Sequence, residues 1–218
     1  MIDDRTILSE IQRTTLENAG DGGATWPSLM WTLDEVLGYL NQRQNRFLAE
    51  TLIGWTVLEA PVMPGQAEQP RPADWIAAIQ LAYKGNGLPY YLLNRSSLRE
   101  LDLSRPFWPG TTTGEAPAAV YEVEGDTLTD YLAPIPTDSA GRLERYYVAM
   151  GAQLQQTPAI GFSVPDEFVP TIKYGALAEM FSKVGPTANS VLAGMAEERW
   201  QEGVEIGKLM STEGWFLG

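Results

Sequence analysis

The chain has 218 residues, of which 44% are hydrophobic, and its 15 basic and 28 acidic side chains give a formal net charge of −13. This composition supplies a sizeable apolar core and argues against intrinsic disorder. The acidic balance argues against a protein that grips nucleic acid or an anionic membrane, because both tasks need a basic surface.

The sequence contains no cysteine and no histidine. The first absence excludes disulfides and thiol catalysis, and the second excludes Ser-His-Asp triads and the usual catalytic zinc ligands. We therefore expect no enzyme activity, no metal and no cofactor. No apolar run approaches the roughly 18 residues of a membrane span, and the acidic N-terminus does not look like a signal peptide. We expect a protein that is made in a cytoplasm and stays off the membrane.

The first predicted element in the chain is a helix over residues 3–18, which glycines and a proline then interrupt. A second helix is predicted to begin at a T-x-x-E capping box, in which Thr32 and Glu35 satisfy each other's backbone N–H groups, and to end near Ala49. The apolar residues that lie one turn apart in the first helix are Ile7, Leu8 and Ile11.

From Thr51 onward the pattern changes to β-branched and aromatic runs separated by glycine and proline. "GQAEQPRP" is predicted to be a loop, "GNG" a tight turn, and "SSLRELD" a short helical turn capped by Ser96 or Ser97. About six strands are expected, and they correspond to "TLIGWTVLEAPVMP", "WIAAIQLAYK", "LPYYLLNR", "AAVYEVEG", "TLTDYLAPIP" and "RLERYYVAM".

The helical period returns at Asp166. Pro170 stands early in this third helix, where it must kink the helix or restart it. An i+4 row is formed by Phe168, Ile172, Ala176 and Met180. A last helix is predicted over residues 188–210. Its apolar residues along one face are Leu192, Met195, Ile206 and Met210.

This order predicts an α+β fold. Helix pairs from the two ends of the chain are expected to form a four-helix bundle, with a central antiparallel β-sheet or sandwich as an insertion. The expected domains are a helical bundle over 1–50 and 160–211, a β insertion over 51–159, and a C-terminal tail over 212–218.

Three pairs of adjacent carboxylates could suggest acid–base chemistry: Asp34 with Glu35, Asp166 with Glu167, and Glu197 with Glu198. Adjacent residues on a helix do not face each other. Acids at helix N-termini offset the helix dipole, and the third pair is predicted to lie on a solvated face. Structural roles are therefore favoured over a glycosidase pair.

Seven tryptophans and nine tyrosines could serve as core, as interface anchors or as sugar-stacking platforms. Phe107 and Trp108 lie in a proline-flanked loop and are candidate interface residues. Trp215, Phe216 and Leu217 are large apolar residues near the C-terminus, where residues are usually polar. They are expected either to pack on their own bundle or to insert into a neighbouring subunit or partner.

The segment "TLDEVLGYLNQRQNRFLAET" resembles the second helix of phage head-to-tail adaptor (connector) proteins, in which a Tyr-Leu-Asn step leads toward the β insertion. The order of "PADWIAAIQLAY", "SLRELDLSRPFW", "DYLAPIP" and "RLERYYVAM" is similar too. "VPDEFVPTIKYGALAEMF" resembles the return into the C-terminal helices, so the resemblance covers roughly residues 30–205.

This resemblance implies a structural virion protein of the neck, between capsid and tail. Such proteins form a homo-oligomeric ring, commonly twelve-fold, that contacts the portal protein and the tail or nozzle proteins. DNA passes through the ring without specific binding, and the C-terminal segment, here Trp215 to Leu217, reaches toward the portal. An acidic channel wall fits this role, because every phosphate that a wall neutralises adds affinity and would slow the DNA.

Two alternatives remain open at this point. A glycan-binding or glycan-cleaving virion or tail protein would use the aromatic rings and the carboxylates, with two acids about 5–10 Å apart in one cleft. Another tail ring component, such as a stopper or tube protein, is the second alternative. The terminal helix pairs favour the adaptor, because tube proteins are expected to be mainly β.

Overall fold

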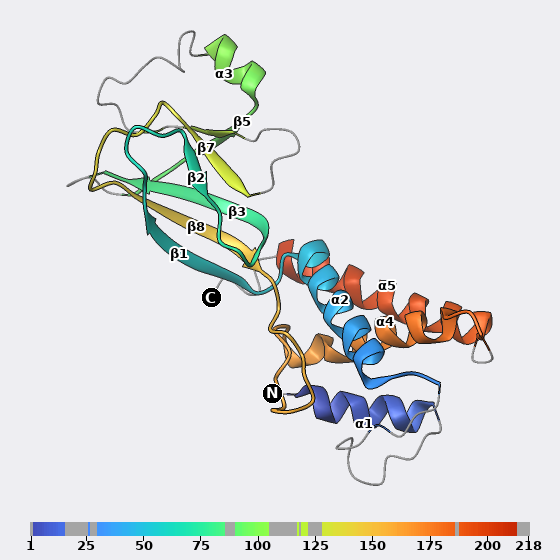
Figure 1. The fold of residues 1–218 in the computed structure, drawn as a ribbon. Coiled ribbons are helices and arrows are strands. Elements are labelled where there is room, and N and C mark those ends of the chain that lie inside the picture. The colour runs from blue at the N-terminus through green and yellow to red at the C-terminus, as the bar shows by residue number, and fades with distance from the viewer. Residues whose placement is uncertain are drawn as a thin grey trace. The chain divides into compact units, whose positions relative to one another are not determined.

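The computed structural model describes residues 2–15, 26, 30–85, 90–104, 117, 119–121, 128–185 and 188–212. Within these ranges the fold is mixed α+β, with five α-helices and two β-sheets (Figure 1). The chain forms two compact units. The helical unit comprises Met1–Gly54 and Met150–Gly218, and the β unit comprises Trp55–Ala149.

Helix α1 (Asp4–Thr14) begins where the Asp3 carboxylate accepts the Thr6 N–H at 2.8 Å. Hydrogen bonds from the hydroxyl and the backbone N–H of Thr6 lower the pKa of Asp3. The helix ends four residues before its predicted end at residue 18, and residues 16–18 lie outside the described ranges. Its predicted apolar row is fully buried and consists of Ile7, Leu8 and Ile11.

Helix α2 (Leu33–Thr51) starts with the predicted capping box. The Thr32 hydroxyl accepts the Glu35 N–H at 3.2 Å, and the Glu35 carboxylate accepts the Thr32 N–H at 2.9 Å. The helix continues two residues beyond the predicted end at Ala49. Leu52 then adopts a left-handed backbone with φ 57°, and Gly54, with φ 77°, completes the exit from the helix.

Helix α4 (Val169–Ser182) follows a 3₁₀ turn, η2 (Asp166–Phe168). Pro170 stands in the first turn of α4, where its missing N–H breaks no helical bond, so of the two predicted outcomes, a kink or a restart, the structure has the restart. Asp166 accepts the N–H of Ile2 at 2.9 Å, which is a structural role as predicted. The predicted i+4 row is buried throughout and comprises Phe168, Ile172, Ala176 and Met180.

Helix α5 (Ser190–Thr212) packs on α2 and α4, and α4 also contacts α1 and α2 (Figure 1). Glycines allow α4 and α5 to approach closely. A Cβ on Gly175 would stand 2.7 Å from the Trp200 ring, and a Cβ on Gly203 would stand 2.1 Å from the Thr171 hydroxyl. Only glycine leaves room for these contacts.

An ion cluster joins α2, α4 and α5. The Arg43 guanidinium lies 2.6 Å from Glu179 and 3.0 Å from Glu197, and its centre lies 5.0 Å from the Trp200 ring centroid. The predicted solvated face is confirmed for Glu198, which is exposed, while the Glu197 side chain is 37% exposed and also takes part in this ion cluster. Burial acts to raise the pKa of Glu197, but hydrogen bonds from Gln201 and Arg43 outweigh it and leave the pKa lowered.

The segment between the β unit and η2 has little regular structure, and polar side chains of α1 and α2 hold it. Buried Asp4 accepts the N–H groups of Gln155 and Ile160 at 2.9 and 3.1 Å. Asn41 bonds both the N–H and the carbonyl of Leu154. Gln44 bonds the Ala152 carbonyl and the Ser163 N–H in the same way. These side chains satisfy backbone groups that would otherwise be buried without partners.

The β unit contains two four-stranded sheets. The first is antiparallel throughout, in the order β1 (Trp55–Pro61), β8 (Arg142–Ala149), β3 (Trp75–Lys84) and β4 (Tyr91–Leu92). The second has the order β2 (Glu68–Pro70), β7 (Thr129–Ala133), β6 (Ala119–Tyr121) and β5 (Asn94–Ser96).

Three features of the β unit differ from the prediction. β2 lies in the predicted loop "GQAEQPRP", because the buried Gln69 side chain binds both the N–H and the carbonyl of Met63 and fixes this segment beside β7. The predicted single strand "LPYYLLNR" divides into β4 and β5, which join different sheets. β5 pairs in parallel with β6, contrary to the all-antiparallel expectation, because α3 (Leu98–Ser104) lies in the connection between them.

Helix α3 is the predicted short helical turn, and Ser97 is its cap. The Ser97 hydroxyl accepts the Glu100 N–H at 3.2 Å, and Glu100 accepts the Ser97 N–H at 2.8 Å. The two sheets share one hydrophobic core, made of Val62, Leu81, Tyr83, Leu93, Val120, Leu132 and Leu143. Trp75 of β3 stacks on Tyr147 of β8, with the ring centroids 4.9 Å apart. These rings therefore serve packing, as the core interpretation predicts.

Candidate assembly surface

Helix α5 presents three different faces. The face that packs on α2 and α4 carries small residues around one large ring, Trp200, which is fully buried. The small residues on this face are Ala193, Ala196, Gly203 and Gly207. They let the helix approach its neighbours closely. Val204 is the fully buried aliphatic residue on this face, and five other aliphatic residues of the helix are exposed.

The exposed aliphatic residues of α5 form two groups on one side of the helix, which we together call the apolar stripe: Val191, Leu192 and Met195 near the start of α5, and Ile206 and Leu209 near its end. The exposed charged side chains of Arg199 and Glu202 lie between the two groups. The exposed fractions of the stripe residues range from 42% to 69%. The residues predicted to share one helix face are Leu192, Met195, Ile206 and Met210. The first three are exposed and Met210 is half-buried, so this face points outward. Exposed aliphatic residues gathered on one helix are typical of protein–protein contacts.

A third surface of α5, along one edge of the stripe, is acidic and carries the exposed residues Glu198, Glu202 and Glu205. With Gly194, Glu197 and Gln201 they line a shallow groove of about 600 Å³. Glu202 pairs with Arg199 at 2.9 Å and Glu205 with Lys208 at 2.8 Å, both exposed, so these pairs add little stability. The hydrogen bond that Lys208 donates to the Glu205 carboxylate raises the pKa of Lys208. Helix α5 therefore places an apolar surface beside an anionic one.

The five interface candidates of the sequence analysis, Phe107, Trp108, Trp215, Phe216 and Leu217, lie outside the described residues. Their predicted role stays a prediction. The apolar stripe was not among the predicted sites, although one signal for it existed. Small residues recur on the opposite face of α5 at helical spacing, which indicates a close helix contact there and leaves the larger residues for another surface.

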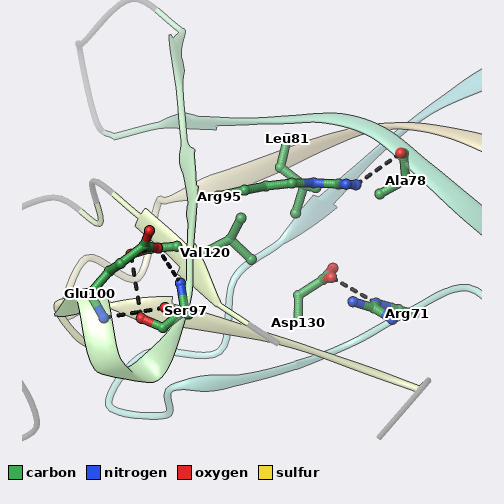
Figure 2. A pocket seen from close by; sticks show the side chains of 9 residues that line it. Arg71, Ala78, Leu81, Arg95, Ser97, Glu100, Val120 and Asp130 are labelled. Carbon is green, nitrogen blue, oxygen red and sulfur yellow. Dashed lines mark hydrogen bonds and ion pairs between the residues drawn. The ribbon is translucent and has the colours of Figure 1, made fainter. Parts of the chain in front are cut away.

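The β unit contains a pocket of about 350 Å³ (Figure 2). It is lined by Arg71, Ala78, Leu81, Arg95, Ser96, Ser97, Glu100, Val120 and Asp130. At one side Asp130 is held by two guanidinium groups. Arg71 Nε donates to its Oδ1 and Arg145 Nε to its Oδ2, both at 2.8 Å. Arg145 also donates to the Pro70 carbonyl at 3.0 Å.

Ser97 and Glu100 lie on the other side of the pocket, with Val120 between them and Asp130 (Figure 2). The backbone N–H of Ser97 is the main cause of a lowered pKa of Glu100. A glycosidase needs one carboxylic acid with a raised pKa. Glu100 is shifted the opposite way and Asp130 is paired to two arginines, so these two acids do not form such a pair.

Within the described ranges, no group of three or more acidic side chains is arranged to hold a metal ion. In the same part of the chain, none of the helices combines the length and the apolar character needed to cross a membrane.

A family model described as SU10 adaptor protein matches residues 6–212, which run from α1 to the end of α5. The chain belongs to the SU10 adaptor protein family. The resemblance to phage head-to-tail adaptors is thereby confirmed, and membership identifies the protein as a structural adaptor of a phage. No curated protein matches the chain.

The adaptor resemblance rested partly on the Tyr39-Leu40-Asn41 step of α2, and the structure gives this step a physical role. Leu40 is fully buried in the helical unit. Asn41 bonds Leu154 in the segment that follows the β unit. In this adaptor the step therefore fixes the path of the returning chain through Asn41.

Proposed function

We propose that this protein is a head-to-tail adaptor that forms a ring, commonly twelve-fold among such proteins, between the portal and the tail of a virion. The family match over residues 6–212 is the observation that carries the proposal. In this role the protein is a component of the neck, uses no cofactor and is not an enzyme. DNA passes through the ring without specific binding.

The apolar stripe of α5 supports self-assembly. A closed ring needs a heterologous contact, in which one surface of a copy meets a different surface of the next. The stripe supplies aliphatic side chains for one half of this contact. In the proposed ring, helices α1, α2, α4 and α5 act together as a four-helix bundle around the channel, formed from residues 1–50 and 160–211.

The acidic face of α5 supports a channel that does not hold DNA. Glu198, Glu202 and Glu205 are adjacent to the stripe on the same helix. If the stripe meets the neighbouring copy, these carboxylates line the inner wall of the ring and repel phosphates. We further propose that the tail, residues 212–218, contacts the portal through Trp215, Phe216 and Leu217, and that Phe107 and Trp108 contact tail or nozzle proteins.

The test is mass photometry of the purified chain over a concentration series, alone and with purified portal, followed by negative-stain imaging of the heaviest species. We expect closed rings of about a dozen copies. Met195→Glu and Leu209→Glu place charges in the stripe and should reduce ring formation at least about tenfold in apparent affinity.

Val184→Glu is the matched control, because Val184 is 96% exposed and lies outside α5. It should leave ring formation unchanged. Rings that form equally well with all three variants would remove the stripe from the subunit contact. A chain that stays monomeric both alone and with portal would overturn the ring proposal.

A further inference from the structure

Strand β1 forms one edge of the first sheet, next to β8 (Figure 1). Its seven residues, Trp55–Pro61, all pair with β8, and no described strand pairs with its other side. The other edge strands of the β unit are β2, β4 and β5, and each of them has only two or three residues. Within the described ranges, β1 is therefore the edge that is long enough to accept a further strand.

The register with β8 decides which backbone groups of β1 face outward. The N–H of Val62, the residue after β1, donates to the Gly141 carbonyl at 3.1 Å, in register with the last pair of the ladder. Hydrogen-bonded and non-hydrogen-bonded pairs alternate in an antiparallel ladder. The residues of β1 that bond to β8 are therefore those two, four and six positions before Val62, namely Ala60, Leu58 and Thr56. The backbone groups of the residues between them point away from β8.

These outward groups belong to Trp55, Val57 and Glu59, and together they form a row of donors and acceptors. In the part of the chain that the structure describes, no other backbone segment bonds to this row. The side chains beside it are exposed on both faces of the sheet, because Val57 is 43% exposed on one face and Leu58 is 38% exposed on the other. A solvent-facing row of this kind binds an extended peptide by strand addition.

A second copy of this chain is a poor occupant for this edge. Head-to-tail addition needs a different edge of matching length, and β2, β4 and β5 are too short. Pairing of β1 with β1 of another copy is two-fold symmetric, so it cannot continue around a ring. It would also bring together two chains that each carry a formal net charge of −13. The occupant that remains is a segment of another protein.

We propose that the β1 edge binds an extended segment of a different protein, which adds to the first sheet as a further strand. Hydrogen bonds to the outward backbone groups supply affinity, and β-branched residues of the segment contact Val57 on one face and Leu58 on the other. The segment has no proline where its N–H groups face β1, because proline has no N–H to donate. The proposal does not rest on ring formation, since the apolar stripe lies on α5 and β1 belongs to the other unit.

The experiment is amide hydrogen exchange of the full-length chain, measured residue by residue by mass spectrometry with electron-transfer fragmentation. The probe is the peptide acetyl-Thr-Val-Thr-Val-Thr-amide, which favours an extended backbone. In the free chain the N–H groups of Val57 and Glu59 should exchange rapidly, whereas β8 should protect those of Thr56 and Leu58. With a roughly millimolar Kd, the probe at about ten times that concentration should slow the exchange of Val57 and Glu59 about tenfold.

Two controls separate strand addition from contact with a sheet face. The same peptide with N-methyl groups on its central residues keeps the side chains but lacks the donors, and it should give no protection. Val57→Pro removes an outward donor without breaking a bond to β8, and it should weaken protection of Glu59 by the probe at least about tenfold. Val57→Thr keeps this donor and should respond within about threefold of the unmodified chain. Protection of Thr56 and Leu58 without the probe verifies that each variant keeps β1 beside β8.

The proposal is overturned if the probe gives no saturable protection, if the N-methylated peptide protects equally well, or if Val57→Pro responds as Val57→Thr does. It is also overturned if Val57 and Glu59 are protected in the dilute free chain, because the edge is then already covered. Protection that grows with the concentration of the chain alone would make a second copy the occupant and would overturn the proposal too.

Discussion

The two units each enclose a three-membered ion cluster, and the two clusters have opposite compositions. In the helical unit one guanidinium, that of Arg43, forms ion pairs with the carboxylates of Glu179 and Glu197. In the β unit one carboxylate, that of Asp130, forms ion pairs with the guanidinium groups of Arg71 and Arg145. The first cluster therefore contains two carboxylates for one guanidinium, and the second contains two guanidinium groups for one carboxylate.

Exposure separates the two clusters more than composition does. The side chains of Glu179 and Glu197 are 36% and 37% exposed, so water hydrates these two carboxylates. The three members of the β-unit cluster are at most 8% exposed. A buried charge must be balanced by a partner because water cannot balance it. Loss of the shared residue should therefore be more harmful in the β unit than in the helical unit.

The largest effect is expected for Asp130→Asn. The substitution keeps the shape but leaves two buried guanidinium groups without their carboxylate, which should lower the free energy of unfolding of the β unit by about 3–5 kcal/mol. Hydrogen exchange of β7 and β8 measures this loss locally.

Glu59→Gln is the control for that experiment. Glu59 and Arg142 are each 49% exposed and 3.9 Å apart. Removal of this ion pair should therefore change the free energy of unfolding by no more than about 1 kcal/mol. Equal protection of β7 and β8 in both variants would mean that burial does not distinguish the two clusters.

The helical unit should be more sensitive to packing than to charge. Gly203→Ala places a Cβ 2.1 Å from the Thr171 hydroxyl and should lower the free energy of unfolding by about 2–3 kcal/mol. In Gly194→Ala the Cβ meets nothing within 4 Å, so better helix propensity should raise stability by about 0.5–1 kcal/mol. Urea unfolding followed by circular dichroism compares the two, and equal shifts would contradict close packing of α4 against α5.

A smaller loss is expected for Arg43→Gln, at about 1–2 kcal/mol, since water can hydrate the two carboxylates that lose their partner. Amide hydrogen exchange in α2, α4 and α5 measures this loss of stability. A loss as large as that of Asp130→Asn would show that the partial exposure of Glu179 and Glu197 does not protect the helical unit.

The smallest effect is expected for the dependence of the free energy of unfolding on acidic pH. Hydrogen bonds from Lys183 and Thr32 lower the pKa of Glu35, and those from Gln201 and Arg43 lower that of Glu197 against the effect of burial. A lowered folded-state pKa stabilises the fold above the ordinary glutamate value of about 4.3 and loses this contribution as pH falls through the folded-state value. Unfolding measured from neutral to acidic pH should show this decline, and Arg43→Gln should flatten it. An unchanged slope in Arg43→Gln would assign the acid sensitivity to other carboxylates.

The sequence by itself determined the features that depend on near neighbours. The capping box of Thr32 and Glu35 and the row from Phe168 to Met180 follow from residues within a few turns of one another. The break in the helix near Pro170 follows in the same way, whereas its form as a restart was decided by the structure. The order of helices and strands also suffices for the adaptor resemblance, which the match over residues 6–212 confirms.

Only the tertiary structure decided which face of α5 is buried. An apolar row and a row of small residues are both compatible with a core, and the close approach of α4 at Gly203 selects the small one. The tertiary structure also decided which strands pair and which charged residues form the ion clusters. Asp130 and Arg71 are separated by 59 residues in the chain, and Arg145 and the Pro70 carbonyl by 75. Local sequence patterns cannot predict such pairs, because these residues interact only after folding brings distant segments of the chain together.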